Sequence, residues 1–155
     1  MTTVFLDSNV FLYAAGAGHP LRAPCQALLA RIADGTLTAT TSVEVVQEVM
    51  HVVARRGRRD QAAEIGEALL ALFPGLLPVT PSIVSRACEI FRRHPHLPVR
   101  DALHAATMIE NAIGTIVTAD RHLDGIDGIR RIDPSRAARL TPPGRRGSPP
   151  PAARS

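Results

Sequence analysis

The sequence predicts an α/β protein with a mostly parallel central sheet that is covered by helices on both faces. Short apolar runs of strand character alternate along the chain with longer segments of helical periodicity, a pattern typical of parallel strands joined by crossover helices. A length of 155 residues and an apolar content of 45% fit a single domain with a sizeable core.

The N-terminal part predicts two strands and two helices. The apolar run at 3–7 indicates a short buried strand, and a brief helix is expected over 9–15. A longer helix is expected over 19–35, where apolar residues recur at helical spacing and Gly35 ends the pattern. The segment TLTAT at 36–40 is typical of a strand.

The middle of the chain predicts two helices, over 42–56 and 58–72, followed by a possible strand at 76–79. Thr41 precedes Glu44 by three residues, which is the spacing of a capping box at the start of the first of these helices.

The C-terminal part predicts helices over 81–94 and 99–114, the second beginning after Pro98. Strands are expected at 115–119 and, at the edge of the sheet, at 129–133.

Composition indicates the domain bounds, the state of the cysteines and the cellular compartment. We expect one domain over residues 1–140 and a disordered tail over 141–155, which is rich in Pro, Gly and Arg. The two cysteines, Cys25 and Cys88, lack metal-ligand spacing and are interpreted as free thiols. No signal peptide or membrane-spanning run is visible, so we expect a cytoplasmic protein without a membrane partner.

All 18 basic residues are arginines, and the formal net charge is +4. The densest group is RRGRR at 55–59, for which two interpretations remain open: a solvated helix end with Gly57 at its stop, which we favour, or a patch that binds phosphate.

Two acidic residues interrupt apolar runs in the same way. Asp7 and Asp120 each stand at the carboxyl end of a predicted strand. Each alone could be a turn residue or a helix cap. Because ligands bind at the carboxyl ends of strands in open parallel sheets, the two together indicate a site at that edge.

Two further carboxylates lie at apolar borders. Glu48 falls between Val45 and Val52, at the edge of the apolar stripe of its helix, where it requires compensation by a ligand or by a nearby arginine. Asp101 lies in the first turn of its helix, where the helix dipole also favours it, and His104 is interpreted as a packed or rim histidine rather than a ligand.

If these four carboxylates converge, a divalent cation would relieve their repulsion. Oxygen ligands without cysteine select Mg²⁺, or Mn²⁺, over zinc. The same repulsion predicts that replacing Asp7 by Asn leaves the metal-free protein as stable or more so.

The motifs FLDSN, TSVEVVQE, RDALHAA and TADRHL, in this order, resemble those of PIN-domain ribonucleases, most closely the VapC-type toxins of bacterial toxin–antitoxin pairs. The resemblance covers residues 3–133. It implies a three-layer α/β/α fold, and a Mg²⁺- or Mn²⁺-dependent endoribonuclease that acts as a toxin.

By this resemblance, the metal-binding and catalytic quartet falls on Asp7, Glu48, Asp101 and Asp120. Ser8 and Asn9 have a supporting role, in which the amide of Asn9 holds the first carboxylate. Many members carry Asp-x-Asp-Phe where this chain has Asp120-Arg121-His122-Leu123. His122 therefore replaces a frequent acid, and whether it or Asp124 contributes, and whether one or two metal ions bind, stays open.

The resemblance also implies partners: an RNA substrate, a cognate antitoxin protein and a second copy in a homodimer. Candidate contacts to the RNA backbone are Arg55, Arg56, Arg58, Arg59 and Arg100. 

Two other functional classes are possible. A haloacid-dehalogenase-like phosphatase would need an acid where this chain has Asn9, and it normally uses a lysine, which this chain lacks. A non-catalytic PIN-like module that binds RNA or protein would have little use for four converging carboxylates.

Overall fold

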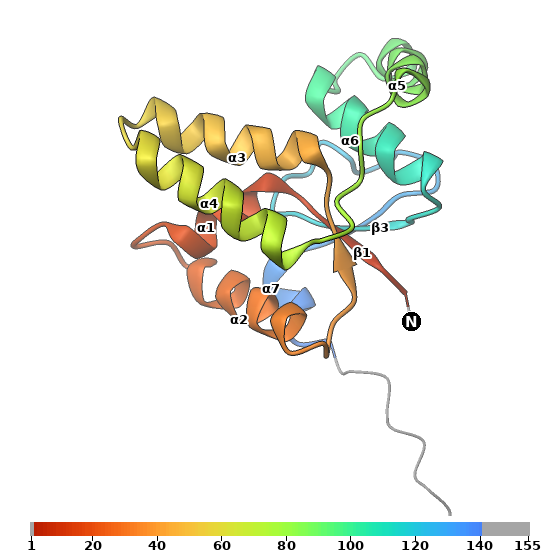
Figure 1. The fold of residues 1–155 in the computed structure, drawn as a ribbon. Helices are drawn as coiled ribbons and strands as arrows, with labels where there is room; N and C mark the ends of the chain where they lie inside the picture. The colour runs from red at the N-terminus through yellow and green to blue at the C-terminus, as the bar shows by residue number, and fades with distance from the viewer. Residues whose placement is uncertain (1, 141–155) are drawn as a thin grey trace, which may run out of the picture.

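The computed structural model describes residues 2–140, and the tail predicted for 141–155 lies outside them. Figure 1 shows the order of the helices and strands. The elements are β1 (Val4–Leu6), α1 (Ser8–Ala15), α2 (Arg22–Ala33), β2 (Ala39–Thr40), α3 (Val43–Arg55), α4 (Arg59–Leu72), α5 (Pro81–Arg93), α6 (Val99–Glu110), β3 (Thr115–Val117), β4 (Arg130–Ile132) and α7 (Pro134–Ala137).

The sheet confirms the predicted parallel arrangement. Its four strands are ordered β2-β1-β3-β4, and each neighbouring pair is parallel. The two central strands are buried: the side chains of Phe5, Leu6, Ile116 and Val117 are fully enclosed in the core. Because β1 and β3 are adjacent and parallel, the residues that follow them emerge at the same edge of the sheet.

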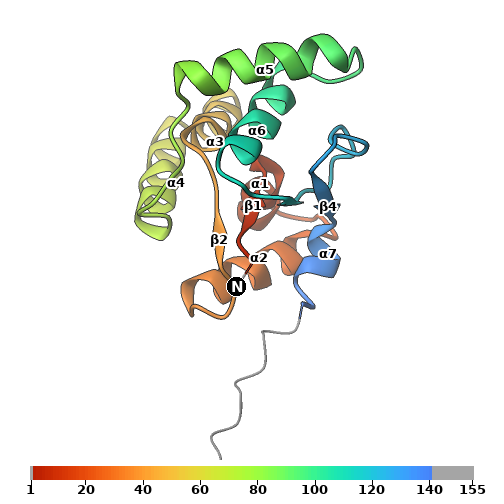
Figure 2. The same cartoon turned by 90° about the vertical axis from the view of Figure 1, so that its right-hand side faces the viewer.

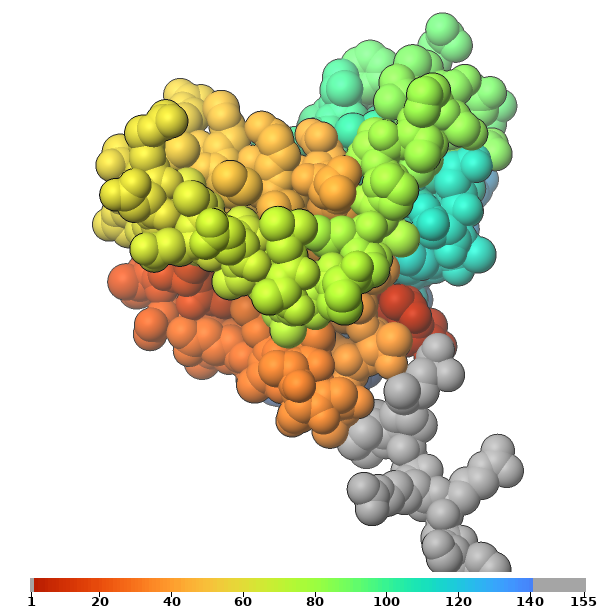
Figure 3. Space-filling model, viewed as in Figure 1, coloured from red at the N-terminus to blue at the C-terminus, as the bar shows by residue number. Residues whose placement is uncertain are grey.

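Helices cover both faces of the sheet. In Figure 2, α2 and α7 lie on one side of the strands, and α5 and α6 lie on the other. The helix α4 packs along α3, and α5 packs along α6. Figure 3 shows α3 and α4 side by side on the face of the molecule turned to the viewer. The helix α3 is amphipathic, with Val45, Val49 and Val53 buried, and Gly57, at φ 77°, permits the left-handed turn that follows it.

Two predicted elements differ in detail, and one short helix was not predicted. The strand expected at 76–79 is reduced to a single bridge between Ser42 and Leu77, because Pro78 has no N–H with which to continue it. The helix expected over 99–114 ends at Glu110, and Ala112 turns the chain towards β3 at φ 54°. The helix α7 was not predicted, although its Asp-Pro start is a helix-start signal, with the carboxylate of Asp133 accepting from the backbone N–H of Ser135.

The predicted capping box at Thr41 and Glu44 is wrong. The hydroxyl of Ser42 caps α3 by accepting from the backbone N–H of Val45. The hydroxyl of Thr41 instead donates to the backbone carbonyl of Leu6 at 2.8 Å and so ties the start of α3 to β1. Within residues 2–140, no helix has both the length and the apolar character needed to cross a membrane.

The free thiols predicted from the sequence are found in different environments, and they should react differently. Cys25 is buried, and its burial, followed by the charge of Asp133, raises the pKa of its thiol to about 11. Cys88 is exposed on α5. Since the thiolate is the reactive form, a thiol reagent at pH 8 should modify one cysteine in the native protein and both after denaturation. Cys88→Ser should abolish the native reaction, and rapid native modification of that variant would contradict the burial of Cys25.

Candidate metal-dependent active site

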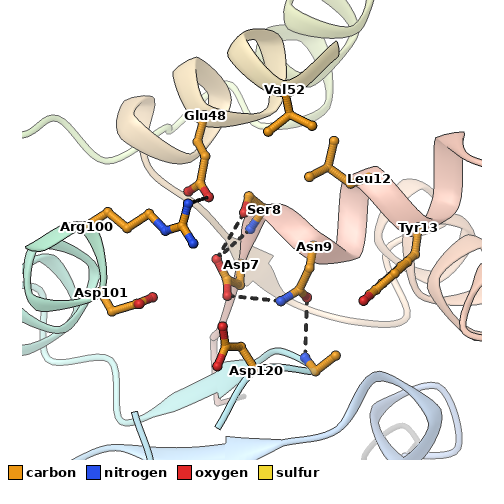
Figure 4. Close-up of a pocket in the computed structure, with 11 residues that line it drawn as sticks. Asp7, Ser8, Asn9, Leu12, Tyr13, Glu48, Val52, Arg100, Asp101 and Asp120 are labelled. Carbon is orange, nitrogen blue, oxygen red and sulfur yellow. Dashed lines mark hydrogen bonds and ion pairs between the residues drawn. The ribbon is translucent and has the colours of Figure 1, made fainter. Parts of the chain in front are cut away.

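A pocket of about 360 Å³ opens at the carboxyl ends of β1 and β3, between α1, α3 and α6. Figure 4 shows the carboxylates of Asp7, Glu48, Asp101 and Asp120 turned towards its centre. Its lining consists of Asp7, Ser8, Asn9, Leu12, Tyr13, Glu48, Val52, Arg100, Asp101, Ala119 and Asp120. The structure thus brings together the acidic quartet that the sequence predicts, with Ser8, Asn9 and Arg100 beside it.

Asp7 connects β1 to α1 and is fixed by several hydrogen bonds. As the N-cap of α1, its Oδ1 accepts from the backbone N–H of Ser8 at 2.7 Å. Its Oδ2 accepts from the hydroxyl of Thr118 at 2.7 Å and from the amide of Asn9 at 3.2 Å. Only 6% of Asp7 is exposed, so these donors replace the water that a buried carboxylate loses.

Asn9 and Thr118 join the two central strands beyond their last paired residues. The amide nitrogen of Asn9 donates to the hydroxyl oxygen of Thr118 at 2.8 Å, and its carbonyl oxygen accepts from the backbone N–H of Ala119 at 3.3 Å. The same hydroxyl oxygen accepts from the backbone N–H of Asp120 at 3.0 Å. Through these bonds the positions of Asp7 and Asp120 are set together.

Glu48 is half-buried between two nitrogen donors. Its Oε1 lies 3.1 Å from the guanidinium of Arg100, and its Oε2 lies 3.3 Å from Nε2 of His104. Burial opposes ionisation, but the hydrogen bond from His104 and the charge of Arg100 outweigh it and hold the pKa of Glu48 below its ordinary value. The arginine partner that the sequence left open as an alternative is therefore present within the pocket itself.

His104 is fully buried, which decides for the packed alternative over the rim alternative that the sequence left open. Its Nε2 also lies 3.8 Å from Oδ1 of Asp7, and its Nδ1 has no hydrogen-bond partner in the described part of the chain. Burial lowers the pKa of His104, but its hydrogen bond to Glu48 and the charge of Asp7 outweigh burial and raise it overall. The imidazole thus offsets the negative charges of Glu48 and Asp7, a role that the sequence did not predict.

Asp101 is a buried carboxylate whose partners do not outweigh the cost of its burial. Only 4% of it is exposed, and burial, followed by the charge of Asp7, raises the pKa of its carboxyl group. Among the described residues, its hydrogen-bond partner is Nδ1 of His122, at 3.1 Å from Oδ2. The same Nδ1 lies 3.0 Å from Oδ2 of Asp120, so that His122 bridges two of the four acids.

Asp124 and four of the arginine candidates lie elsewhere. Asp124 is exposed and paired with Arg131, with 2.8 Å between Oδ1 and Nε, and it does not line the pocket. Arg56 and Arg58 lie in the turn between α3 and α4, and Arg55 and Arg59 are the helix residues on either side of it. This turn is not remote, because Arg56 and Arg58 line a small neighbouring pocket that shares Leu12 with the acidic one.

Three contributors escaped sequence reasoning: the capping network through Thr118, the buried charge partner His104 and the bridge made by His122. Thr118 directly follows β3, two residues before Asp120, and a hydroxyl at that place is the available signal. His104 lies one helical turn after Asp101, which places both on the same side of α6. The partners of these side chains come from other elements and have no local signal.

The donor set fits a divalent cation. One ligand atom each of Asp7, Glu48 and His104 lies within 4.8 Å of the other two. The remaining carboxylates, Asp101 and Asp120, face the same pocket. The pKa of Asp101 is raised first by burial and then by the charge of Asp7, and a cation would offset both effects. Oxygen-rich sites of this kind suit Mg²⁺ and Mn²⁺.

The comparison with protein families identifies the chain. A family model described as PIN domain matches residues 4–129. The chain belongs to the PIN-domain family. This membership confirms the family that the four motifs predict and decides against the haloacid-dehalogenase-like alternative.

Curated relatives of this PIN-domain protein are VapC ribonucleases. Ribonuclease VapC7 of Mycobacterium tuberculosis is 35% identical over 139 residues, which cover 89% of this chain and 96% of the relative. Ribonuclease VapC13 of the same organism is 32% identical over 129 residues, covering 83% and 98%. The PIN-domain protein thus matches VapC ribonucleases over almost their full length.

Solved structures support the fold. VapC20 of Mycobacterium tuberculosis, described as a sarcin-ricin loop cleaving toxin, aligns with a TM-score of 0.67 at 19% identity, covering 80% of this chain and 95% of that one. FitAcB from Neisseria gonorrhoeae aligns with a TM-score of 0.66 at 20% identity, covering 84% and 97%. The three-layer α/β/α fold implied by the sequence motifs is confirmed.

The hydrogen bonds revise the expectation for Asp7. Asp7→Asn presents an NH₂ group in place of one acceptor oxygen, and we now expect it to destabilise the metal-free PIN-domain protein by about 1–3 kcal/mol. Asp101→Asn should instead be neutral or stabilising at pH 7, because a pKa raised on folding means that ionisation of Asp101 opposes the folded state above that pKa.

Urea unfolding of both variants in EDTA measures this contrast. Equal destabilisation by the two substitutions would show that Asp101 is as well compensated as Asp7. Repeating the comparison at pH 4 is a further check, because the advantage of Asp101→Asn should shrink as the wild-type carboxyl group takes up a proton.

Proposed function

We propose that this PIN-domain protein is a metal-dependent endoribonuclease that acts as the toxin of a toxin–antitoxin pair. The observation that carries the proposal is the convergence of four carboxylates in one pocket of a chain whose relatives are VapC ribonucleases. A module that only bound RNA would gain nothing from a buried acidic cluster that repels the phosphate backbone.

Asp7 and Asp101 are the proposed primary metal ligands, and Asp120 and Glu48 complete the site directly or through water. When bound, Mg²⁺ or Mn²⁺ supplies the Lewis acidity needed to hydrolyse a phosphodiester with water. The chain's own contribution is orientation: Ser8, Asn9 and Thr118 fix the carboxylate of Asp7 before any ligand arrives.

Arg100 and the α3–α4 turn are the proposed contacts to RNA. The side chain of Arg100 is 54% exposed at the rim of the pocket while its guanidinium contacts Glu48. A phosphate entering there would meet a positive charge next to the carboxylates. Beyond Leu12, Arg56 and Arg58 extend this positive surface, so that an RNA strand could pass along α1 and α3.

The proposed partner is a cognate antitoxin protein. Solved neighbours include a toxin–antitoxin complex from Klebsiella pneumoniae and VapBC2 from Rickettsia felis bound to a promoter DNA fragment. A cytoplasmic ribonuclease requires such an inhibitor to spare its host. We also propose that the protein forms a homodimer and acts in the cytoplasm.

Cleavage of RNA by Asp101→Asn tests the function. We expect a loss of at least roughly 100-fold, because the substitution removes a ligand without unfolding the protein. Asp127→Asn is the matched control: Asp127 is exposed in the loop after β3 and lies outside the pocket, so its activity should equal that of the wild type. Undiminished cleavage by a folded Asp101→Asn variant would refute the proposed site.

The path of the RNA is tested by salt dependence. Replacing Arg56 and Arg58 by alanine should weaken binding of single-stranded RNA and lower the slope of log K against log salt by roughly 0.7 for each lost phosphate contact. The paired control replaces Arg92 and Arg93, which are exposed on α5 and do not line the pocket. Equal effects of the two double variants in filter binding would point to nonspecific attraction.

A further inference from the structure

The acidic pocket has a second side that is not acidic. Its lining includes the half-buried side chains of Leu12, Tyr13 and Val52. Figure 4 shows these three on one side of the pocket, with Glu48 and Asp101 on the other. A hydrated ion and a phosphate group are polar, so neither gains from apolar and aromatic walls. The lining as a whole therefore fits a ligand that is both anionic and aromatic, as a nucleotide is.

Tyr13 is the aromatic side chain on this side of the pocket. It lies four residues after Asn9 on α1, and residues at this spacing share one face of a helix. At a rise of about 1.5 Å per residue, the two positions are about 6 Å apart along the helix axis. Asn9 in turn holds the carboxylate of Asp7. Tyr13 thus lies about one helical turn beyond the side chain that positions a proposed metal ligand, a separation that one nucleotide spans.

The ring of Tyr13 is supported from outside the pocket. The imidazole of His19, in the loop between α1 and α2, stacks on it with 4.1 Å between ring centroids and 18° between ring planes. The Nδ1 atom of His19 accepts from the backbone N–H of Leu21 at 3.1 Å, which orients the imidazole. Since His19 does not line the pocket, the stacked pair meets it through the tyrosine. A ring that is already fixed loses little conformational entropy when a ligand binds.

We propose that Tyr13 is the stacking platform for an unpaired nucleobase next to the cleaved phosphate, and that His19 positions its ring. This inference rests on the ribonuclease function proposed above. Single-stranded RNA is commonly recognised through bases that stack on aromatic side chains. Of the described residues that line the pocket, Tyr13 is the one with an aromatic ring. The substrate is therefore single-stranded where it is cut, because a base within a duplex cannot reach the ring.

The alternative is a purely structural role, since Tyr13 also packs against the core. Two observations favour a ligand: the ring lines the pocket, and the residue stacked on it is exposed and so adds nothing to the core. The two roles differ in how they depend on bases. Loss of a structural residue would weaken the binding of any RNA backbone, whereas loss of a stacking platform weakens only the binding of strands that carry bases.

The fluorescence of the full chain reports this contact directly. Because the sequence has one tyrosine and no tryptophan, its intrinsic emission above 300 nm comes from Tyr13. The probes are an RNA of eight adenosines and an abasic strand with the same ribose–phosphate backbone. Affinities are measured by the anisotropy of a label on the strand, with Mg²⁺ present and in an Asp101→Asn background, so that the RNA is not cut. KM and kcat for RNA cleavage are measured with Asp101 intact.

The variants separate the ring from its surroundings. Tyr13→Leu removes the ring, Tyr13→Phe removes the hydroxyl group, and Tyr13→Trp keeps an aromatic ring that can be excited where RNA absorbs little. His19→Ala removes the support. The matched control is Phe91→Leu, which removes an aromatic ring that is 45% exposed on α5 and lies outside the pocket. Thermal melts show which variants are folded, and the quenching of Tyr13→Trp decides if Tyr13→Leu is not.

The adenosine strand should quench the emission of residue 13, and the abasic strand should not. Tyr13→Leu should weaken binding of the adenosine strand by roughly fivefold or more and raise KM by a similar factor, with kcat within about twofold of the wild type. Its affinity for the abasic strand should stay within about twofold, because no base is lost. Tyr13→Phe and Phe91→Leu should bind like the wild type, and His19→Ala should lie between the wild type and Tyr13→Leu.

Other outcomes overturn the inference. Equal weakening of both strands by Tyr13→Leu, or binding of the adenosine strand without quenching, would assign Tyr13 a structural role. An affinity of His19→Ala equal to that of the wild type would refute the positioning role of His19. Cleavage by the wild type together with an unchanged KM in Tyr13→Leu would refute the stacking platform and leave the proposed function intact. A wild-type chain that neither binds nor cleaves RNA with Mg²⁺ or Mn²⁺ would instead refute the proposed function.

Discussion

Asp7 ends β1 and begins α1, and its carboxylate is hydrogen-bonded to donors from both sides of that junction and from the end of β3. One oxygen caps the helix, and the other accepts from Asn9 and Thr118. The position of Asp120 depends on the same Thr118 hydroxyl. A charge buried at this place is tolerable only because its donors are supplied by the backbone turn and by the neighbouring strand. The rest of the pocket is arranged around a carboxylate that cannot move without breaking these bonds.

The carboxylates of Glu48 and Asp101 differ in how many nitrogen groups stabilise their charge. Glu48 has both Arg100 and His104, which hold its pKa low, whereas Asp101 has the partly exposed His122 and a raised pKa. The pocket is therefore partly balanced on the α3 side and electrostatically strained on the α6 side. A cation next to Asp101 would stabilise its buried charged form and offset its repulsion from Asp7.

The sheet and the four carboxylates could be predicted from the sequence because both depend on local patterns. Neighbouring residues determine where strands end, where helices start and where apolar stripes run. The residues that follow parallel strands all lie at the carboxyl edge of the sheet. Side-chain contacts could not be predicted where the partner residue is distant in the sequence. Thr41 was interpreted as half of a capping box, but its hydroxyl bonds to Leu6, a residue of another strand. The contact of His104 with Glu48 and the bridge made by His122 likewise join side chains of different elements. The strand expected near Leu77 failed for a local reason that was visible, since Pro78 cannot donate.

The pairing of β1 with β3 also determines at what stage of folding the pocket forms. Asp7 and Thr118 are separated by 111 positions along the chain, yet their side chains share a hydrogen bond. Contacts of such high sequence separation form late in folding and slow it, because a long loop must close before they are gained. During synthesis, the segment carrying Thr118 and Asp120 leaves the ribosome only after most of the domain has emerged. A nascent or truncated chain that lacks this segment has no complete pocket, so the fold itself delays chemical competence until the translation of the domain is nearly finished.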